Sequence, residues 1–130
     1  MHLESPVSKV NKPAQYIYDS LTNVENFRKL MPDSIAKFEV LGDDSFIFGL
    51  SGMPEIKLKI AQKIPPSQIV LNSPSEKLSF SLTGDIKPIS NTESEVKLLF
   101  DGEFNAMMAM MIKGPITKFL ETLAANMSKL

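Results

Sequence analysis

Few side chains in this sequence could perform chemistry, and that scarcity already narrows its function. The 130-residue chain has no cysteine and a single histidine, His2, which lies near the N-terminus and is expected to be exposed. Thiol nucleophiles, disulfide scaffolds, cysteine-ligated metals and most imidazole catalysis are therefore excluded. The acidic side chains of Asp33, Asp43-Asp44, Glu93 and Glu95 fall in predicted turns or on polar strand faces. We interpret them as solvated groups, and we predict no catalytic residue, no metal and no cofactor.

Motifs that bind phosphate or activate a nucleophile are also missing. The sequence contains no glycine-rich phosphate loop, no G-x-S-x-G elbow and no H-E-x-x-H. Lys57, Lys59 and Lys63 form a row, but 14 basic residues balance 15 acidic ones for a net charge of -1. We interpret the row as a wet strand face, and we predict neither nucleic-acid binding nor an electrostatic membrane contact.

Methionine is the least ordinary feature of the chain. Four of its eight methionines, Met107, Met108, Met110 and Met111, lie in the apolar run 106–112. In a straight helix Met107, Met110 and Met111 would point toward the polar side. Three hypotheses follow: a broken helix that turns them into the core, a soft gate at a cavity mouth, or a contact with a partner or a second copy.

The first third of the chain predicts one strand and two short helices. Residues 2–10 are expected to form a strand, followed by a helix over 14–21 with Asn11 as its cap and Pro13 at its start. Thr22 and Glu25 match a capping box for a second helix over 24–31, which Pro32 ends.

The remainder of the chain predicts strands and one long helix. From residue 35 to 104 apolar and polar residues alternate in short runs separated by turns, as in Ile56, Leu58 and Ile60 against Lys57 and Lys59. This pattern predicts six or seven antiparallel strands in one curved sheet. A helix from about 105 to the end carries one apolar stripe, and Gly114-Pro115 predicts a kink or a break in it.

The order of these elements resembles the helix-grip fold of the START-like, or SRPBCC, superfamily. The most specific part is residues 11–27, NKPAQYIYDSLTNVENF, with a proline-initiated helix and a polar cap before a second helix. The C-terminal pattern is most similar to two branches, one related to an accessory subunit of carbon monoxide dehydrogenase and one to polyketide cyclase/lipid-transport proteins. The predicted fold is therefore a single α+β domain over residues 1–130, with the sheet wrapped around the C-terminal helix.

The resemblance implies an apolar cavity between the sheet and this helix. The alternation independently places many apolar side chains on one face, but they could equally fill a solid core. Asn72, or Gln62, is the candidate for fixing a ligand's polar end. The candidate lining residues are Phe38, Phe48, Ile56, Leu58, Ile60, Asn72, Phe80, Leu82, Leu98, Phe100, Met108, Met111, Ile112 and Phe119.

These observations predict a noncatalytic binding or carrier domain for a hydrophobic or amphipathic small molecule, such as a lipid or polyketide. One alternative is an interaction or assembly factor that uses the segment 107–111, and a second is a cyclase- or hydrolase-like enzyme. No apolar run reaches the roughly 20 residues that a membrane span needs. We therefore expect a cytoplasmic monomer or homodimer.

Overall fold

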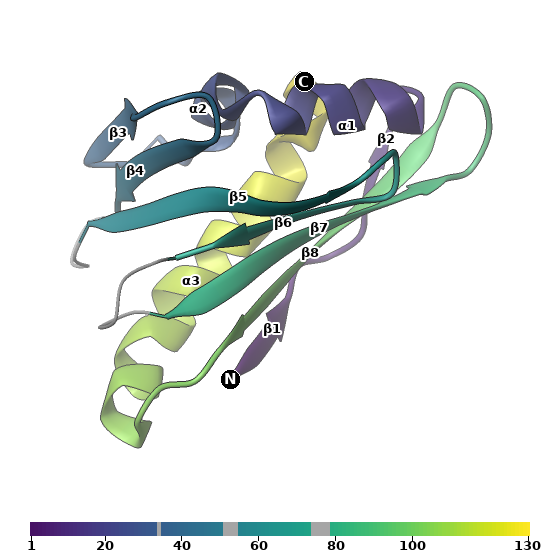
Figure 1. Ribbon diagram of the computed structural model, residues 1–130. Helices are drawn as coiled ribbons and strands as arrows, with labels where there is room; N and C mark the ends of the chain where they lie inside the picture. The colour runs from purple at the N-terminus through teal and green to yellow at the C-terminus, as the bar shows by residue number, and fades with distance from the viewer. Residues whose placement is uncertain (34, 51–54, 74–78) are drawn as a thin grey trace.

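A curved antiparallel sheet wraps around one long helix, as Figure 1 shows. This computed structural model describes residues 1–33, 35–50, 55–73 and 79–130. In that part of the chain eight strands form one sheet in the order β1-β8-β7-β6-β5-β4-β3, and β2 also pairs with β8. The strands are β1 His2–Glu4, β2 Ser8–Val10, β3 Lys37–Val40, β4 Ser45–Gly49, β5 Ile56–Ile64, β6 Gln68–Asn72, β7 Phe80–Pro88 and β8 Ser94–Gly102. The predicted α+β class and curved antiparallel sheet are confirmed.

The predicted first strand is divided into two. Both β1 and β2 pair with β8, but Ser5, Pro6 and Val7 separate them. Pro6 has no backbone N–H to donate to the sheet. At the break the Ser5 backbone N–H donates to the Leu98 carbonyl at 2.8 Å, and the Ser5 hydroxyl accepts from the Leu98 N–H at 2.9 Å. A side chain therefore replaces one backbone hydrogen bond where the strand is interrupted.

Short helices follow these strands, as predicted, but their caps differ. They are α1 Ala14–Thr22, the 3₁₀ turn η1 Val24–Asn26 and α2 Phe27–Leu30. Pro13 occupies the N-cap position of α1, so the prediction of Asn11 as the cap is wrong. The capping box is wrong as well, because Thr22 is still helical and the side chain of Asn23 accepts from the Glu25 N–H at 3.2 Å.

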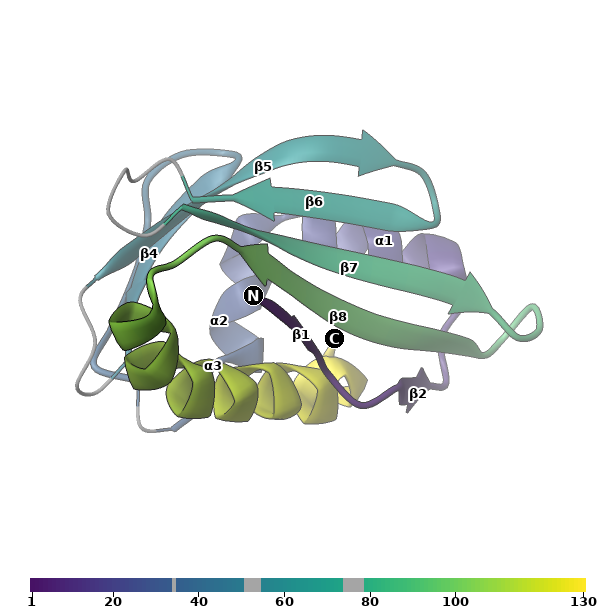
Figure 2. The same ribbon diagram turned by 90° about the horizontal axis from the view of Figure 1, so that it is seen from below.

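The C-terminal helix α3 spans Ala106–Asn126 and ends in the 3₁₀ turn η2 Met127–Lys129. It continues through Pro115, so the predicted break does not occur. Ile112 and Ile116, on either side of the proline, are buried and hold both halves of the helix on the sheet. Pro115 itself is exposed, so the carbonyl that loses its partner is not trapped in the core. Figure 2 shows the first turns of α3 curving away from the line of the remainder.

Aromatic side chains join α3 to the sheet. Phe48 of β4 stacks on Phe119 of α3, with ring centroids 4.9 Å apart and planes 5° apart. Phe46, its neighbour on the same face of β4, lies 5.0 Å from Phe27 of α2. β4 therefore packs against both α2 and α3, which fixes the distance between these helices.

None of the helices in the described part of the chain is both long and apolar enough to cross a lipid bilayer.

The N-cap of α3 gives a first test of this fold. The Asn105 side-chain oxygen accepts from the Met108 N–H at 2.8 Å. Asn105→Ala should lower the free energy of unfolding by about 1 kcal/mol because it leaves a helix-terminal N–H without that partner. Urea denaturation measures the change, and Asn105→Ser, which keeps a capping oxygen, should recover most of it. Equal losses in both variants would contradict the role of the cap.

Candidate functional site

The interior between sheet and α3 is filled by the side chains that were expected to line a cavity. Ten of these residues are at least nine-tenths buried: Phe48, Ile56, Leu58, Ile60, Phe80, Leu82, Leu98, Phe100, Ile112 and Phe119. They belong to one hydrophobic cluster. A void of about 10 Å³ lies elsewhere in this core, between strands β6 to β8 and the elements α1, α2 and η2, among Leu21, Phe27, Ile69, Leu71, Leu82, Gly84, Leu98 and Met127. A space of that size holds one water molecule at most, so it cannot admit an organic ligand.

The other four predicted lining residues lie away from the interior. Phe38 is half-buried on the edge strand β3, where the Arg28 guanidinium lies 4.8 Å from the centre of its ring. Asn72 is exposed, so it cannot fix a ligand's polar end inside the core. Met108 is half-buried against the cluster, whereas Met111 is 64% exposed. The placement of Asn72 and Met111 in an interior cavity is therefore corrected.

Three of the four clustered methionines are exposed, as their predicted position on the polar side of the helix implies. Met107, Met110 and Met111 are 74%, 83% and 64% exposed. The hypothesis of a broken helix that turns them into the core is wrong, because α3 is continuous from Ala106 and these side chains face solvent.

A groove with an apolar floor lies on the flank of α3, outside the core. It has a volume of about 360 Å³ and lies between the helix, Leu50 directly after β4, and Pro32, the second residue after α2. Such a volume falls at the lower end of the range for small-molecule sites. The lining residues are Pro32, Leu50, Gly114, Pro115, Lys118, Phe119 and Thr122.

The floor of the groove is apolar and rigid. Phe119 is 4% exposed and Leu50 is 8% exposed, so both show the groove only a small part of an otherwise buried side chain. The stack on Phe48 holds the Phe119 ring in place. Gly114 leaves its side of the groove open, because a Cβ added there would meet no atom within 4 Å apart from those of the adjacent residues and the helix's own backbone.

The rim of the groove supplies two polar groups. Lys118 is exposed and carries an ammonium group. Thr122, one turn later, donates its hydroxyl to the Lys118 carbonyl at 2.9 Å, and its oxygen remains able to accept. This combination of an apolar floor and a cationic rim suits an amphipathic molecule with an acidic end.

Sequence reasoning identified only one of these groove residues, Phe119. Pro32 and Leu50 are far from α3 in the chain, so no local pattern could join them to it. The helix side did carry a signal, since Gly114, Pro115, Lys118, Phe119 and Thr122 recur at intervals of three and four residues.

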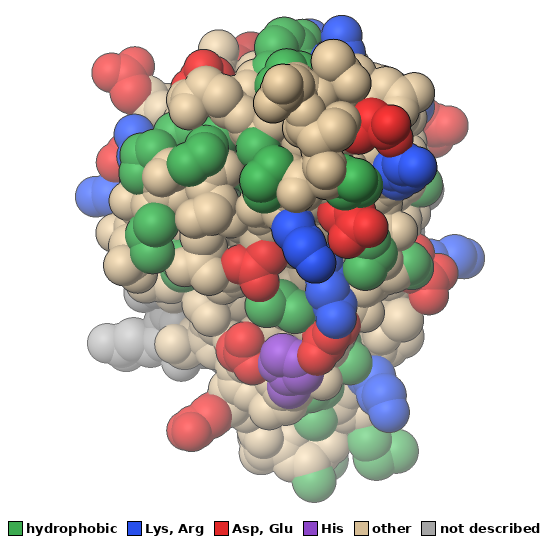
Figure 3. All heavy atoms as spheres, turned by 90° about the vertical axis from the view of Figure 1, so that its right-hand side faces the viewer, with side chains coloured by type: hydrophobic (Ala, Val, Ile, Leu, Met, Phe, Trp, Pro, Cys, Tyr) green, Lys and Arg blue, Asp and Glu red, His purple; other side chains and the backbone are tan. Residues whose placement is uncertain are grey.

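A second recess, of about 760 Å³, lies at the start of β7 and the end of β8. Its lining is mainly polar and backbone: Met1, His2, Asn72, Ser73, Ser79, Phe80, Ser81, Asp101, Gly102 and Glu103. Figure 3 shows the histidine at the surface, with acidic and basic side chains around it. The imidazole therefore lies on a charged, solvated surface.

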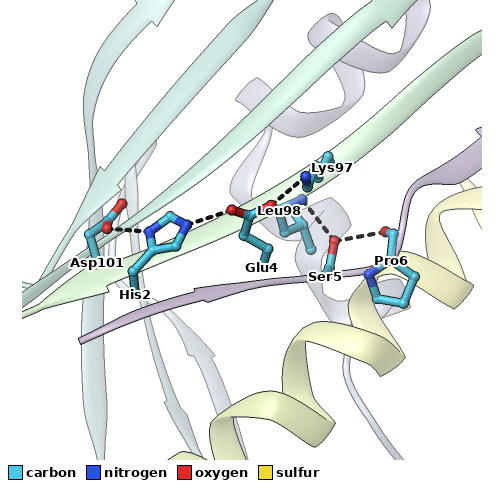
Figure 4. Close-up of polar contacts among 7 residues, drawn as sticks. All are labelled: His2, Glu4, Ser5, Pro6, Lys97, Leu98 and Asp101. Carbon is cyan, nitrogen blue, oxygen red and sulfur yellow. Dashed lines mark hydrogen bonds and ion pairs between the residues drawn. The ribbon is translucent and has the colours of Figure 1, made fainter.

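His2 is held by two carboxylates. Nδ1 lies 2.5 Å from an Asp101 oxygen and Nε2 lies 2.7 Å from a Glu4 oxygen, as Figure 4 shows. Glu4 also pairs with Lys97. Hydrogen bonds to Asp101 and then Glu4 raise the pKa of His2 above 6.5. Both ring nitrogens are thus engaged by acceptors, which favours a surface network that fastens β1 to β8 over a general base.

Metal-ligand geometry is absent from the described residues: 1–33, 35–50, 55–73 and 79–130 contain no cluster of three or more side chains of His, Cys, Asp or Glu that could hold an ion.

The chain is similar to known proteins in structure but not in sequence. No protein-family model matches the sequence, and no curated protein does. Norcoclaurine synthase from Thalictrum flavum superposes with a TM-score of 0.76 at 15% identity, over 99% of this chain and 84% of that chain. A START superfamily protein from Mycobacterium smegmatis gives 0.70 at 11% identity, over 98% and 94%. A conserved protein from Geobacillus kaustophilus gives 0.69 at 13% identity, over 99% and 93%.

These similarities establish the fold of the chain. An antiparallel sheet curved around a C-terminal helix, with short helices after the first strands, is shared with these structures over almost the entire chain. The chain has the START-like fold, also called the helix-grip fold of the SRPBCC superfamily. The predicted resemblance is confirmed at the level of the fold, and at identities this low the similarity carries no activity with it.

The His2 network gives a pH-dependent test. Its raised pKa means that the contribution of protonated His2 to fastening β1 is fully present below pH 6.5 and is lost as pH rises through the raised value. Glu4 has a lowered pKa, caused first by Lys97 and then by His2, so its contribution is present above 4.5 and is lost as pH falls through the lowered value. Because Glu4 contributes fully above pH 4.5 and protonated His2 contributes fully below pH 6.5, β1 should be attached most strongly between pH 4.5 and 6.5.

Asp101→Asn should lower the pKa of His2 toward 6.5, because it removes the largest cause of the upward shift. An NMR titration of the imidazole resonances measures that pKa directly. Glu95→Gln, on the same strand but outside the network, is the matched control and should leave the titration unchanged. An unchanged pKa in Asp101→Asn would show that the network does not form in solution.

Proposed function

We propose that this protein binds a hydrophobic or amphipathic small molecule without transforming it, and that it does so in the groove between α3 and the end of β4. The observation that carries the proposal is the groove itself, with a recess of about 360 Å³ over a rigid apolar floor. The sequence-based prediction placed the ligand inside the fold. The proposed site still lies between the sheet and the C-terminal helix, but it is a surface groove where α3 meets the end of β4.

The filled core favours the groove over the interior. An organic ligand inside would have to displace side chains that are at least nine-tenths buried in one hydrophobic cluster. Opening such a core sacrifices contacts that a ligand must then replace. The groove already exists, so binding in it requires no rearrangement of the sheet or of α3.

The lysine on the polar rim indicates that the ligand has an acidic group. Lys118 is the only ionisable residue among the described residues that line the groove. Its ammonium would pair with a carboxylate or a similar acidic group, while Pro115, Leu50 and Phe119 contact an apolar body. A single lysine does not make an acid–base pair, which favours binding over catalysis.

One structural relative of this chain is an enzyme, which bears on the alternative that this chain is an enzyme as well. A norcoclaurine synthase structure from Thalictrum flavum contains dopamine and hydroxybenzaldehyde, and it shares this fold at 14% identity. That relative supports the idea that the fold accommodates small molecules. A specific reaction for this chain would need reacting groups in the groove beyond Lys118, and the described lining supplies none.

Filling the groove at Gly114 tests the site. Gly114→Leu should weaken octanoate binding at least 10-fold, because its side chain occupies space that is open beside Gly114. Gly114→Ala is the matched control: it adds one methyl group, should retain most of the affinity, and places the same Cβ before Pro115 as the leucine variant does. Isothermal titration calorimetry measures affinity, and thermal unfolding checks that both variants are folded. Undiminished binding to folded Gly114→Leu would place the ligand elsewhere.

Reversing the charge at the rim tests the acidic end of the ligand. Lys118→Glu should weaken octanoate binding about 10-fold by replacing attraction with repulsion. It should change binding of 1-octanol, which has the same chain and no charge, less than twofold. Lys113→Glu makes the same charge change on the opposite side of α3 and should leave both ligands unaffected. Equal effects of Lys118→Glu and Lys113→Glu would point to general electrostatics and not to the groove.

A further inference from the structure

The lining of the groove described above reaches Gly114 and includes neither Met111 nor Met108. Lys118, Pro115 and Met111 follow one another toward the start of α3 at intervals of three and four residues, and Met108 comes three residues earlier. Side chains at this spacing stack along one face of a helix. Thr122 and Phe119 belong to the same stripe at its other end. Helix periodicity therefore aligns two apolar residues, Met111 and Met108, with the helix side of the groove, beyond the recess itself.

Two of the four clustered methionines belong to this stripe. With about 100° between successive residues, Met108 and Met111 lie within roughly 30° of its centre line. Met110 lies roughly 130° away, and Lys113 is nearly opposite the stripe. By their positions on the helix, Met108 and Met111 could extend the groove, whereas Met110 could not.

These two methionines expose apolar surface that a ligand could cover. Met108 is half-buried against the core cluster, and Met111 leaves 64% of its side chain in water. Figure 3 shows hydrophobic side chains protruding at the end of the molecule where α3 begins. Methionine adapts to irregular apolar shapes, so it suits a flexible chain better than a rigid ring.

The stripe also has a defined length and a charge at one end. From Lys118 to Met108 it spans ten residues, which is about 15 Å along the axis or roughly the length of an extended twelve-carbon chain. No charged residue lies on the stripe between these two positions. A cation followed by an uncharged apolar track is complementary to a molecule with one acidic end and one long tail.

We propose that Met108 and Met111 form the tail-binding part of the site, so that the ligand is a long-chain carboxylate whose acidic group pairs with Lys118. Its chain fills the groove over Pro115 and then runs along the methionines toward the start of α3. This inference rests on the proposed function and adds the ligand class and its direction. A second copy of the chain is a poorer occupant, because three exposed methionine side chains supply well under the roughly 800 Å² per partner that a stable interface buries.

The test compares octanoate, which is short enough to fill the groove alone, with dodecanoate, both below the concentrations at which they form micelles. Dodecanoate should bind about 10-fold more tightly to the wild-type protein, since its four additional methylene groups are only partly removed from water on the exposed methionine surface. Met111→Gln keeps the length of the side chain and makes it polar, so most of that gain should disappear while octanoate binding is unchanged. Met110→Gln is the matched control, and the gain should survive in it. Both positions are exposed, so both variants should fold.

The possible results separate this inference from the proposed function. Equal affinities of octanoate and dodecanoate, each abolished by Gly114→Leu, would overturn the methionine extension and retain the groove. Binding of neither acid in a Gly114-dependent way would overturn both. Equal losses in Met111→Gln and Met110→Gln would indicate non-specific adsorption and would overturn the extension. Light scattering on the same samples would overturn it as well if Met111→Gln converted a dimer into a monomer.

Discussion

The stack of Phe48 on Phe119 is the contact on which the site depends. It joins β4, near the edge of the sheet, to the middle of α3 at a ring separation of 4.9 Å. The stacked rings hold the middle of α3 against β4, and the side chains of the surrounding core are buried. The same contact fixes the Phe119 ring as the floor of the groove. One aromatic pair therefore belongs both to the core where a ligand was expected and to the recess where we propose one.

The fold could be predicted from the sequence because its signals are local and repeated. The alternation of Ile56, Leu58 and Ile60 with lysines identifies a half-buried strand, and all three apolar residues are indeed buried. Capping was less predictable, because neighbouring polar residues compete for the same role. Asn23 and not Thr22 caps the turn after α1, a difference of one residue that a pattern such as T-x-x-E cannot resolve.

The site could be predicted only in part. Alternation tells which face of a strand is dry, but it carries no information about whether the dry faces meet or leave a space between them. Phe119 was identified from its helical stripe, whereas Pro32 and Leu50 enter the groove only because the chain folds back on α3. The exposure of Met107, Met110 and Met111 was within reach, since straight-helix geometry already placed them on the polar side. The continuity of the helix through Pro115 was the piece of information that the sequence lacked.

Gly114 and Pro115 show how the helix accommodates the groove. Relative to alanine, glycine costs about 1 kcal/mol and proline about 3 kcal/mol inside a helix, so this pair is an unfavourable choice for helical stability alone. At these positions glycine removes the side chain that would fill the recess, and proline presents a flat apolar ring without a polar backbone N–H. Ile112 and Ile116, buried on the other side of the same turn, keep the weakened segment helical. A local violation of helix propensity that coincides with an apolar recess is a pattern expected at functional sites. This coincidence supports the proposal that the groove binds a ligand.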